Sequence, residues 1–294
     1  MKKLIEKAEV LIEALPYIRE FYGKTFVIKY GGAAQVEASL KDAFARDVVL
    51  LNYIGINAVI VHGGGPRISE MMKKMGKMPS FVQGQRVTDE ETIDIVEMVL
   101  EGLVNKEIVS LINRHGGMAV GLTGKDGGLI KAVKKVIRKT SDETGMDEVI
   151  DLGLVGKVKE VNPAILESLE SNGFIPVVAP VGVSSEGVTM NINADSVASV
   201  LASALAAEKL ILLTDVAGIN DMKDQVVSTA KTRDIKKMIQ KGTISGGMIP
   251  KVQAYMDALK GGVAKTHIID GRVPHCLLLE IFTEKGIGTE ILTK

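Results

Sequence analysis

Short, uninterrupted apolar runs along the chain predict strands buried between two layers of helices. The run Phe26-Val27-Ile28 is the first, and similar runs occupy residues 57–62 and 209–214. Such continuity is typical of a parallel strand, because a strand with one wet face would alternate apolar and polar residues. Glycine follows all three runs, and the carboxyl ends of parallel strands are where α/β proteins bind ligands. The pattern therefore predicts a sheet with ligand-binding loops along one edge.

Apolar residues spaced three or four positions apart predict helices between the strands. The first helix should span residues 4–18, and its Pro16 should kink or end it. A crossover helix is expected over residues 36–51. A longer helix should begin at the capping box Thr88-Asp89-Glu90-Glu91 and run to about residue 115. Strands and helices thus alternate, as in an α/β protein.

The middle of the chain combines short apolar runs with turn-forming residues. Pro176 and Pro180 lie in an apolar run at 174–180, which predicts a strand at the sheet edge or a strand terminus, because proline cannot donate to the ladder. Small residues cluster at 182–187, where we place the boundary between two lobes. We also expect, in chain order, a loop or hairpin at 71–88, strands at 118–122, 129–137 and 156–161, and a hairpin excursion at 140–148.

The composition excludes several classes of protein. Of the 294 residues 46% are hydrophobic, and 36 basic against 36 acidic side chains give a formal net charge of zero. Such a chain has no overall field to attract nucleic acid or an anionic membrane. The single cysteine, Cys276, cannot form an internal disulfide or a thiolate metal site, which favours the cytoplasm. Charges interrupt the N-terminal apolar residues and no later apolar run spans a bilayer, so we expect neither secretion nor membrane insertion.

Two glycine-rich turns after the first two strands predict an anion site. Taken alone, Lys29 before Gly31-Gly32 is more typical of a surface lysine before a turn. The second turn, Gly63-Gly64-Gly65-Pro66, favours the anion site, because the loops of two βα units share one edge of the sheet. Bare backbone N–H groups at a helix N-terminus bind anions. His62, just before this turn, is more typical of a structural hydrogen bond than of a catalyst.

The second half of the chain adds polar residues at the same kind of position. The segment Asn191-Ile192-Asn193-Ala194-Asp195 leads into an alanine-rich helix and has more polar groups than capping requires. Lys251 follows Pro250 in the first turn of another helix, where the macrodipole already makes a cation unfavourable. A bound anion would remove this conflict, so we interpret Lys251 as a phosphate contact rather than a solvated lysine. The glycine-rich turn at 124–128 lacks the P-loop pattern.

Five segments together resemble the amino acid kinase family, and within it the arginine-sensitive acetylglutamate kinases. They cover nearly the whole chain in the family's order: Lys29-Tyr30-Gly31-Gly32, His62-Gly63-Gly64-Gly65-Pro66, Asn191 to Asp195, Leu213 to Gly218, and Gly246 to Lys251. The resemblance implies transfer of the γ-phosphoryl group of ATP to the side-chain carboxylate of N-acetyl-L-glutamate, in arginine biosynthesis. It also implies a three-layer α/β fold with an open, mostly parallel sheet of about eight strands. An N-terminal lobe (1–183) would bind substrate and dimerise, and a C-terminal lobe (184–294) would bind ATP.

The resemblance assigns roles to individual residues. Lys29 and Lys251 would neutralise the moving phosphoryl group, with Asp195 orienting both lysines. The backbone of Gly32 and Gly64 would donate hydrogen bonds to the phosphoryl oxygens. Magnesium would arrive with the ATP phosphates rather than in a protein cage. The substrate would contact Gly63, Gly64, Gly65, Arg86 and Asn191, and the nucleotide would contact Lys29, Thr214, Asp215, Gly218, Gly246, Gly247 and Lys251.

Two features resemble the arginine-inhibited branch specifically. One is the N-terminal helix (1–22), which would interlace with a partner's helix and join dimers into a hexamer, a trimer of dimers. The other is the C-terminal region, in which feedback arginine would contact Tyr17, His267, Glu280 and the backbone near Gly286. The alternative is that these residues only complete the fold. The resemblance also raises the PII signalling protein as a candidate partner.

Three rival functions remain in view. Ala33-Ala34-Gln35 stands where many relatives carry Asn and Met, a departure beside the substrate loop. A kinase acting on the longer acetylaminoadipate, in lysine biosynthesis, differs only by the room for one methylene. A noncatalytic arginine sensor on the same fold is disfavoured by the joint presence of Lys29, Asp195 and Lys251. A nicotinamide oxidoreductase is disfavoured because no Gly-x-Gly-x-x-Gly follows a strand.

Overall fold

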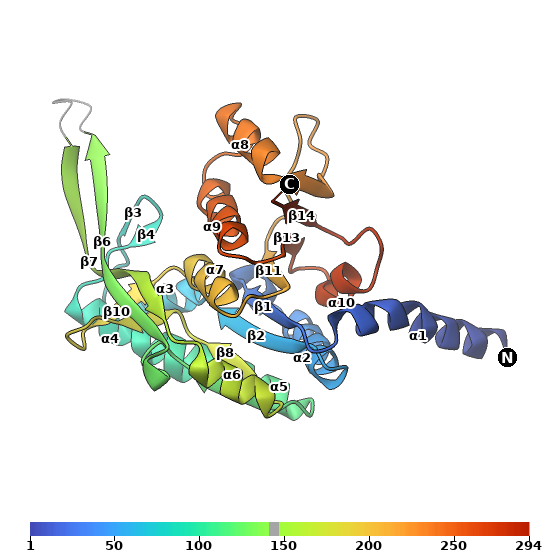
Figure 1. The fold of residues 1–294 in the computed structure, drawn as a ribbon. Helices are drawn as coiled ribbons and strands as arrows, with labels where there is room; N and C mark the ends of the chain where they lie inside the picture. The colour runs from blue at the N-terminus through green and yellow to red at the C-terminus, as the bar shows by residue number, and fades with distance from the viewer. Residues whose placement is uncertain (141–146, 294) are drawn as a thin grey trace.

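The computed structural model describes residues 1–140 and 147–293, and it confirms the predicted sheet. Eight strands form one sheet, in which every neighbouring pair is parallel except the antiparallel pair β13 and β14. Figure 1 shows this sheet through the middle of the molecule. In spatial order the strands are β12 (Thr229–Lys231), β14 (Thr289–Leu292), β13 (Lys265–Asp270), β11 (Lys209–Thr214), β1 (Thr25–Tyr30), β2 (Asn57–His62), β8 (Ile175–Val178) and β5 (Ala119–Leu122).

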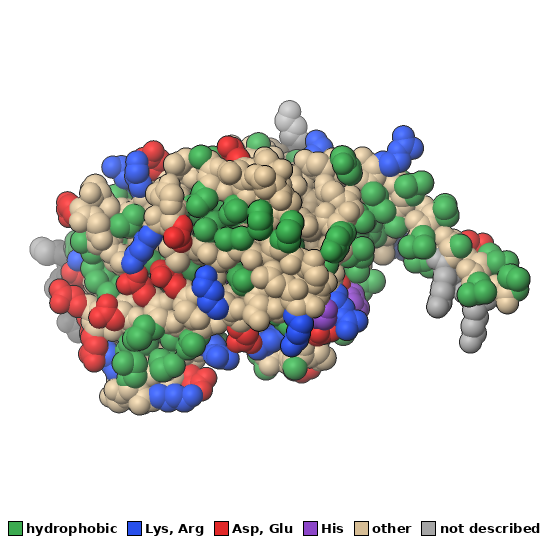
Figure 2. All heavy atoms as spheres, turned by 90° about the horizontal axis from the view of Figure 1, so that it is seen from below, with side chains coloured by type: hydrophobic (Ala, Val, Ile, Leu, Met, Phe, Trp, Pro, Cys, Tyr) green, Lys and Arg blue, Asp and Glu red, His purple; other side chains and the backbone are tan. Residues whose placement is uncertain are grey.

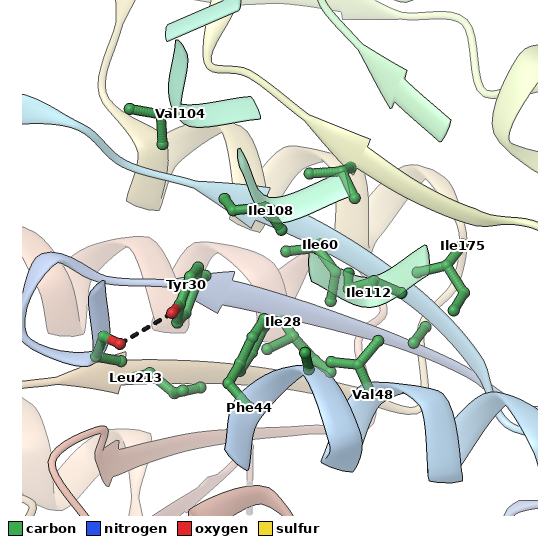
Figure 3. Close-up of a cluster of buried hydrophobic side chains, with 14 of the residues drawn as sticks. Ile28, Tyr30, Phe44, Val48, Ile60, Val104, Ile108, Ile112, Ile175 and Leu213 are labelled. Atoms are coloured by element: carbon green, nitrogen blue, oxygen red, sulfur yellow. Dashed lines mark hydrogen bonds between the residues drawn. The ribbon is translucent and has the colours of Figure 1, made fainter. Parts of the chain in front are cut away.

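Helices cover both faces of the sheet, as the continuous apolar strands predicted. Alternate residues of β1 face opposite layers: Ile28 and Tyr30 belong to one buried cluster and Val27 to the other. Figure 3 shows the first cluster, where the ring of Tyr30 stacks on Phe44 with 3.9 Å between centroids. The helices of this layer include α2 (Ala38–Tyr53), α5 (Asn105–Arg114) and α10 (Cys276–Ile281), and those of the opposite layer include α6 (Ala164–Ser171), α7 (Ala194–Ala204) and α9 (Met248–Lys260).

A second, smaller set of strands closes on itself beside the main sheet. Its four strands make a closed ladder, of which the sequence predicted strands at 129–137 and 156–161 but neither the other two strands nor the closure. Two of them extend into a long antiparallel ribbon, the upward arm in Figure 1, and the predicted hairpin tip at 141–146 lies outside the described residues. The strands are β6 (Ile130–Thr140), β7 (Asp147–Val161), β9 (Val181–Val183) and β10 (Thr189–Ile192), and a separate hairpin pairs β3 (Phe81–Val82) with β4 (Gln85–Arg86).

The predicted long helix is continuous in space but changes its winding in the middle. A π-helical segment, Met98–Val104, joins α4 (Glu90–Glu97) to α5. The predicted capping box is wrong by one residue, because the Asp89 carboxylate, and not Thr88, accepts the hydrogen bond from the Thr92 N–H. The other helices are α3 (Gly65–Lys74) and α8 (Thr232–Gln240), with 3₁₀ turns at Gly32–Gln35 and Asp126–Gly128.

Two predictions that relied on proline need correction. Pro16 does not end the first helix, because α1 runs from Lys2 to Phe21. The proline-containing strand β8 is not at the sheet edge, since it lies between β2 and β5. Pro176 is tolerated there because it is the second residue of β8, before the pairing with β2 begins at Val177.

Helix α1 projects from the body of the molecule, with the N-terminus at its far end (Figures 1 and 2). Hydrophobic side chains of its first fifteen residues are largely exposed, whereas Phe21 at its end is buried and packs edge-to-face on Phe26. The exposed ones are Leu4, Ile5, Val10, Leu11, Ile12 and Leu15. In the part of the chain that the structure describes, every helix is too short or too polar to span a bilayer.

Glu170 on α6 should make stability depend on pH. Burial raises the pKa of its carboxyl to about 7, and the Thr25 hydroxyl donates a long hydrogen bond to it, at 3.5 Å. Because this folded pKa lies above the unfolded value, the stabilisation is complete below pH ~4.5 and is lost as the pH rises through about 7. The melting temperature of the wild-type protein should therefore fall between pH 5 and pH 8, and Glu170→Gln should reduce this fall by a few degrees. The corresponding change in the free energy of unfolding is about 1 kcal/mol, after a discount for the partial solvent exposure of Glu170. Scanning calorimetry would measure it. Glu167 is exposed on the same helix and its charge is the smallest of the causes that shift the Glu170 pKa, so Glu167→Gln should retain most of the wild-type fall.

Candidate active site

Three charged side chains from three different elements meet at the carboxyl edge of the sheet. Lys29 is the last residue but one of β1, Asp195 lies in the first turn of α7, and Lys251 lies in the first turn of α9. The Lys29 Nζ is 2.9 Å from one carboxylate oxygen of Asp195, and the Lys251 Nζ is 3.6 Å from the other. One carboxylate thus holds two lysines that are 222 positions apart in the sequence (251 − 29).

The electrostatics of this triad favour an anion. Burial alone would raise the pKa of Asp195, but the adjacent charges of Lys29 and Lys251 outweigh it and hold the pKa below its usual value. Asp195 is therefore ionised at neutral pH, and with both lysines protonated the triad carries a net charge of +1. The side chain of Lys251 is 26% exposed, against 10% for Lys29, so the positive charge is accessible mainly from the side of α9. An incoming anion would balance this charge.

Local sequence explains how the triad is held. The Asn193 side chain caps α7 by accepting from the Ser196 N–H at 3.1 Å, which fixes the first turn that carries Asp195. Pro250 lies in the first turn of α9, as predicted, and Lys251 follows it. Lys29 is fixed because β1 pairs on both sides, with β2 and β11.

The glycine turns differ in what each residue does. A Cβ on Gly31 would overlap the carbonyl oxygen of Leu213 and lie 3.3 Å from the Lys29 Nζ, so only glycine fits there. A Cβ on Gly64 would lie 2.6 Å from a methyl carbon of Leu100. Gly32 has open space on its side-chain face, which leaves its backbone approachable. The sequence had singled out Gly32 and Gly64 as ligands, whereas the steric need for glycine at 31 shows only in the fold.

A cavity beside the triad brings together the predicted substrate residues. Its walls include Gly63, Gly64, Gly65, Arg86 and Asn191, and also Ala194, the neighbour of Asp195. We call it the glycine-loop cavity. Its lining is otherwise mostly apolar, with Phe81, Leu100, Val155 and Pro180 among the contributors.

Arg86 is the cation of the glycine-loop cavity. Its guanidinium donates to the Gly65 carbonyl at 2.9 Å and to the Ser69 hydroxyl at 2.8 Å, and it lies over the ring of Phe81. Burial lowers the pKa of Arg86, but guanidinium stays charged at neutral pH. These contacts hold the side chain in one orientation beside Gly65, ready to bind a carboxylate.

A second cleft lies on the other side of the triad, and we call it the Asp215 cleft. Asp215 and Gly218 line it, and so do Ser245 and Met248, which flank the predicted Gly246 and Gly247. Thr214 does not line this cleft, and its hydroxyl donates to the Asp215 carboxylate at 3.0 Å. Arg272 lines the cleft but was not predicted, although it follows the carboxyl end of β13, the signal that located the other loops.

A third cavity, here the Glu280 cavity, brings together the four residues predicted for an effector. Tyr17, His267, Glu280 and Gly286 all line it. His267 is deeply buried, and burial lowers its pKa, so the neutral ring donates to Glu280 at 2.7 Å and accepts from Lys209 at 3.2 Å. The backbone N–H groups of residues 287 and 288 also donate to Glu280, at 2.7 and 3.2 Å. Sequence reasoning missed Lys209, Lys265, Glu284 and Glu290, which line the same cavity.

A metal cage is not evident in the described part of the chain. Within residues 1–140 and 147–293, no three His, Cys, Asp or Glu side chains cluster in a metal-binding arrangement. Asp195, the buried acid of the triad, is already engaged by two lysines, which compete with a cation for its oxygens.

Comparisons with known proteins agree on one family. A model of the amino acid kinase family matches residues 24–270. The chain is 58% identical over 291 residues to the acetylglutamate kinase of Geotalea daltonii, covering 99% of both chains. Among solved structures it resembles an N-acetylglutamate synthase from Neisseria gonorrhoeae in two complexes, both with coenzyme A. The complex with N-acetyl-glutamate gives a TM-score of 0.85 and 26% identity, and the complex with L-arginine gives 0.81 and 25%. Both matches cover 98% of this chain, but only 63% and 65% of the synthase.

Proposed function

The chain belongs to the amino acid kinase family of phosphotransferases, within which its curated relatives are acetylglutamate kinases, and from this premise we propose its reaction. It transfers the γ-phosphoryl group of ATP to the side-chain carboxylate of N-acetyl-L-glutamate, in arginine biosynthesis. A carboxylate oxygen bonds to the γ-phosphorus as the bond to the β–γ bridging oxygen breaks. The products are an acyl phosphate, N-acetylglutamyl 5-phosphate, and ADP.

The Lys29–Asp195–Lys251 triad is the observation that carries the proposal. A carboxylate nucleophile is already charged and needs no general base, so catalysis rests on positioning and on neutralising the phosphoryl oxygens. The two lysines meet this need, since Asp195 aligns both and leaves one net positive charge for the anion. The N–H groups of Gly32 and Gly64 complete the phosphoryl site.

The two cavities beside the triad fit the two substrates. The glycine-loop cavity takes N-acetylglutamate, with Arg86 binding a carboxylate and Asn191 the acetamido group. The Asp215 cleft takes ATP, with Thr214 to Gly218 and the Gly246-Gly247 loop along the nucleotide. Asp195 follows Ala194 of the first cavity, and Lys251 lies three residues after Met248 of the second, so the triad lies where the γ-phosphate meets the carboxylate.

Magnesium would enter with the ATP phosphates and would neutralise part of their negative charge, while Lys29 and Lys251 neutralise the transferring group. We propose that residues 1–183 form the substrate-binding, dimerising lobe and residues 184–294 the nucleotide-binding lobe. Lys29 and Lys251 then belong to different lobes, and their approach to the phosphoryl group completes the site when both substrates bind.

A side-by-side assay tests the reaction. Acyl phosphates react with hydroxylamine, so the protein is incubated with ATP, Mg²⁺ and either N-acetylglutamate or N-acetylaminoadipate, and the hydroxamate is measured. We expect hydroxamate from acetylglutamate at least tenfold faster than from acetylaminoadipate. Hydroxamate from neither substrate would refute the kinase, and a preference for the longer one would move it to lysine biosynthesis.

We further propose that arginine inhibits the enzyme from the Glu280 cavity. The cavity joins carboxylates and amines, the partners that a guanidinium, an α-carboxylate and an α-amino group require. The resemblance to a synthase whose structure holds L-arginine supports this choice of ligand. Glu280 already accepts three hydrogen bonds. Exposed carboxylates at the rim of the Glu280 cavity, such as Glu284, would therefore bind the arginine guanidinium together with Glu280.

Helix α1 is proposed to join dimers into a hexamer through its exposed apolar residues. A deletion that tests this role must leave the end of α1 in place, because Tyr17 lines the Glu280 cavity and Phe21 belongs to the buried core. Deletion of residues 1–13 should therefore reduce the mass in light scattering from a hexamer to a dimer while turnover without arginine stays within about twofold. A truncated protein of unchanged subunit number would refute this role for α1. Cytoplasmic location and binding of PII remain predictions from the sequence.

A further inference from the structure

His62, which is fully buried at the end of β2, belongs to a hydrogen-bond network that the proposed mechanism does not use. Its Nδ1 lies 3.0 Å from the carbonyl oxygen of Gly63, and its Nε2 lies 3.2 Å from the amide nitrogen of Asn105. The same amide nitrogen lies 2.8 Å from the Val177 carbonyl on the neighbouring strand β8. Asn105, the first residue of α5, thus links the ends of two strands that point at the glycine-loop cavity.

The chemistry of these partners leaves one protonation state for the ring. Since a carbonyl only accepts, Nδ1 of His62 must carry the proton that it donates to Gly63. Nε2 is then the acceptor for the Asn105 amide, whose orientation is fixed by the second acceptor, the Val177 carbonyl. Burial also lowers the pKa of His62 to about 4, so the ring stays neutral at physiological pH.

The hydrogen bond to Gly63 has a direct effect on Gly64. The Gly63 carbonyl and the Gly64 N–H belong to one planar trans peptide, in which the two groups point in opposite directions. With the carbonyl held against the buried ring, the Gly64 N–H is turned away from it. Among the residues that the structure describes, no group accepts a hydrogen bond from this N–H, and Gly64 lines the glycine-loop cavity.

The π-helical segment Met98–Val104 completes the arrangement. Leu100 and Val104 of this segment pack on Gly64, where a Cβ would lie 2.6 Å and 3.4 Å from their methyl carbons. Asn105 follows directly, and the segment therefore sets both the packing on Gly64 and the reach of Asn105 to His62. Turns of π-helix are rare in proteins, and those that do occur are frequently found at functional sites.

We propose that His62 and Asn105 are positioning residues of the phosphoryl site, which hold the Gly63–Gly64 peptide so that the Gly64 N–H faces the transferring group. The proposal rests on the proposed function, which assigns this N–H to the phosphoryl oxygens. The two residues act through the peptide and do not touch the substrates. The network should therefore affect turnover more than substrate binding.

Two substitutions of His62 separate its two hydrogen bonds. An asparagine amide reaches the place of Nδ1 and can still donate to the Gly63 carbonyl, whereas a glutamine amide reaches the place of Nε2 and leaves that carbonyl without its donor. We expect His62→Asn to keep kcat within about threefold of wild type. His62→Gln should lower kcat by about tenfold to a hundredfold with KM for both substrates within about threefold.

Nitrogen NMR of labelled histidine gives a readout that does not depend on activity. The wild-type His62 should show a proton on Nδ1, none on Nε2, and no titration between pH 5.5 and 9. A proton on Nε2, or His62→Gln with wild-type kcat, would overturn the proposal. Equal losses of kcat in both variants would also overturn it, since packing alone would explain them. If the wild-type protein makes no acyl phosphate, the proposed function itself has failed. That outcome is distinct from failure of the present proposal, which is judged by comparing variants with an active wild-type enzyme.

Discussion

Lys251→Ala is expected to lower kcat by about a thousandfold, equivalent to about 4 kcal/mol of transition-state stabilisation. The Lys251 ammonium is the more exposed of the two cations on Asp195, and its removal leaves the triad with no net charge for the phosphoryl group. KM for acetylglutamate should change little, because Arg86 and Asn191 provide the proposed binding of that substrate. Steady-state kinetics with both substrates varied would measure the effect.

Lys260→Ala is the matched control for this experiment. Lys260 is the last residue of the same helix, is exposed, and within the described part of the chain pairs only with the nearby Asp257, at 2.8 Å. Its loss should leave kcat within about twofold, since an exposed pair contributes little. Both variants should melt within a few degrees of wild type. A Lys251→Ala protein that is folded and turns over near the wild-type rate would remove Lys251 from the chemistry.

Asp195→Asn is expected to lower kcat by about a hundredfold or more and to destabilise the ligand-free protein. The substitution keeps the shape of the side chain but leaves Lys29, which is buried, and Lys251 without the carboxylate between them. Repulsion between two unpaired ammonium groups should lower the melting temperature, and a bound polyphosphate should restore more stability than it adds to wild type.

Melting curves with and without ATP, at low and high salt, would measure this second effect. Asp257→Asn, at an exposed acid on α9 with its own lysine partner, is the control and should respond to ATP as wild type does. An Asp195→Asn protein with wild-type turnover and wild-type response to ATP would show that the carboxylate does not organise the lysines.

The sequence predicted those parts of the fold that depend on neighbours along the chain. Continuous apolar runs located the central strands and, at the carboxyl end of one of them, Lys29. Polar groups in excess of capping located Asp195, and a cation in the first turn of a helix located Lys251. The closed ladder of β6, β7, β9 and β10 was not predicted, since closure depends on pairing between distant strands. Strand β8 accepts Pro176 in the sheet interior for a similar reason: the register with β2 decides which N–H groups are needed.

The site shows the same division. The family resemblance indicated Arg86, and the position at a helix start indicated Lys251. Gly31, in contrast, is required only because the Leu213 carbonyl, far away in sequence, approaches it. Lys209 looked like an ordinary charge at the start of a strand, yet the fold buries it beside His267. Asn105 gave no signal at all, because its partners come from β2 and β8 and its reach depends on the π-helical segment.

The central place of β1 in the sheet has a consequence for how the protein is made. This strand leaves the ribosome well before one of its two neighbours, β11, which begins 179 residues after β1 ends (209 − 30). Its Val27 face is covered by the cluster to which α7 and α9 contribute, again from the second half of the chain. During synthesis at ~5–20 residues per second, one edge of this apolar strand must therefore remain unpaired for about ten to forty seconds, until β11 has been made. Refolding from denaturant should likewise be slow, since pairings of such long sequence separation are closed late.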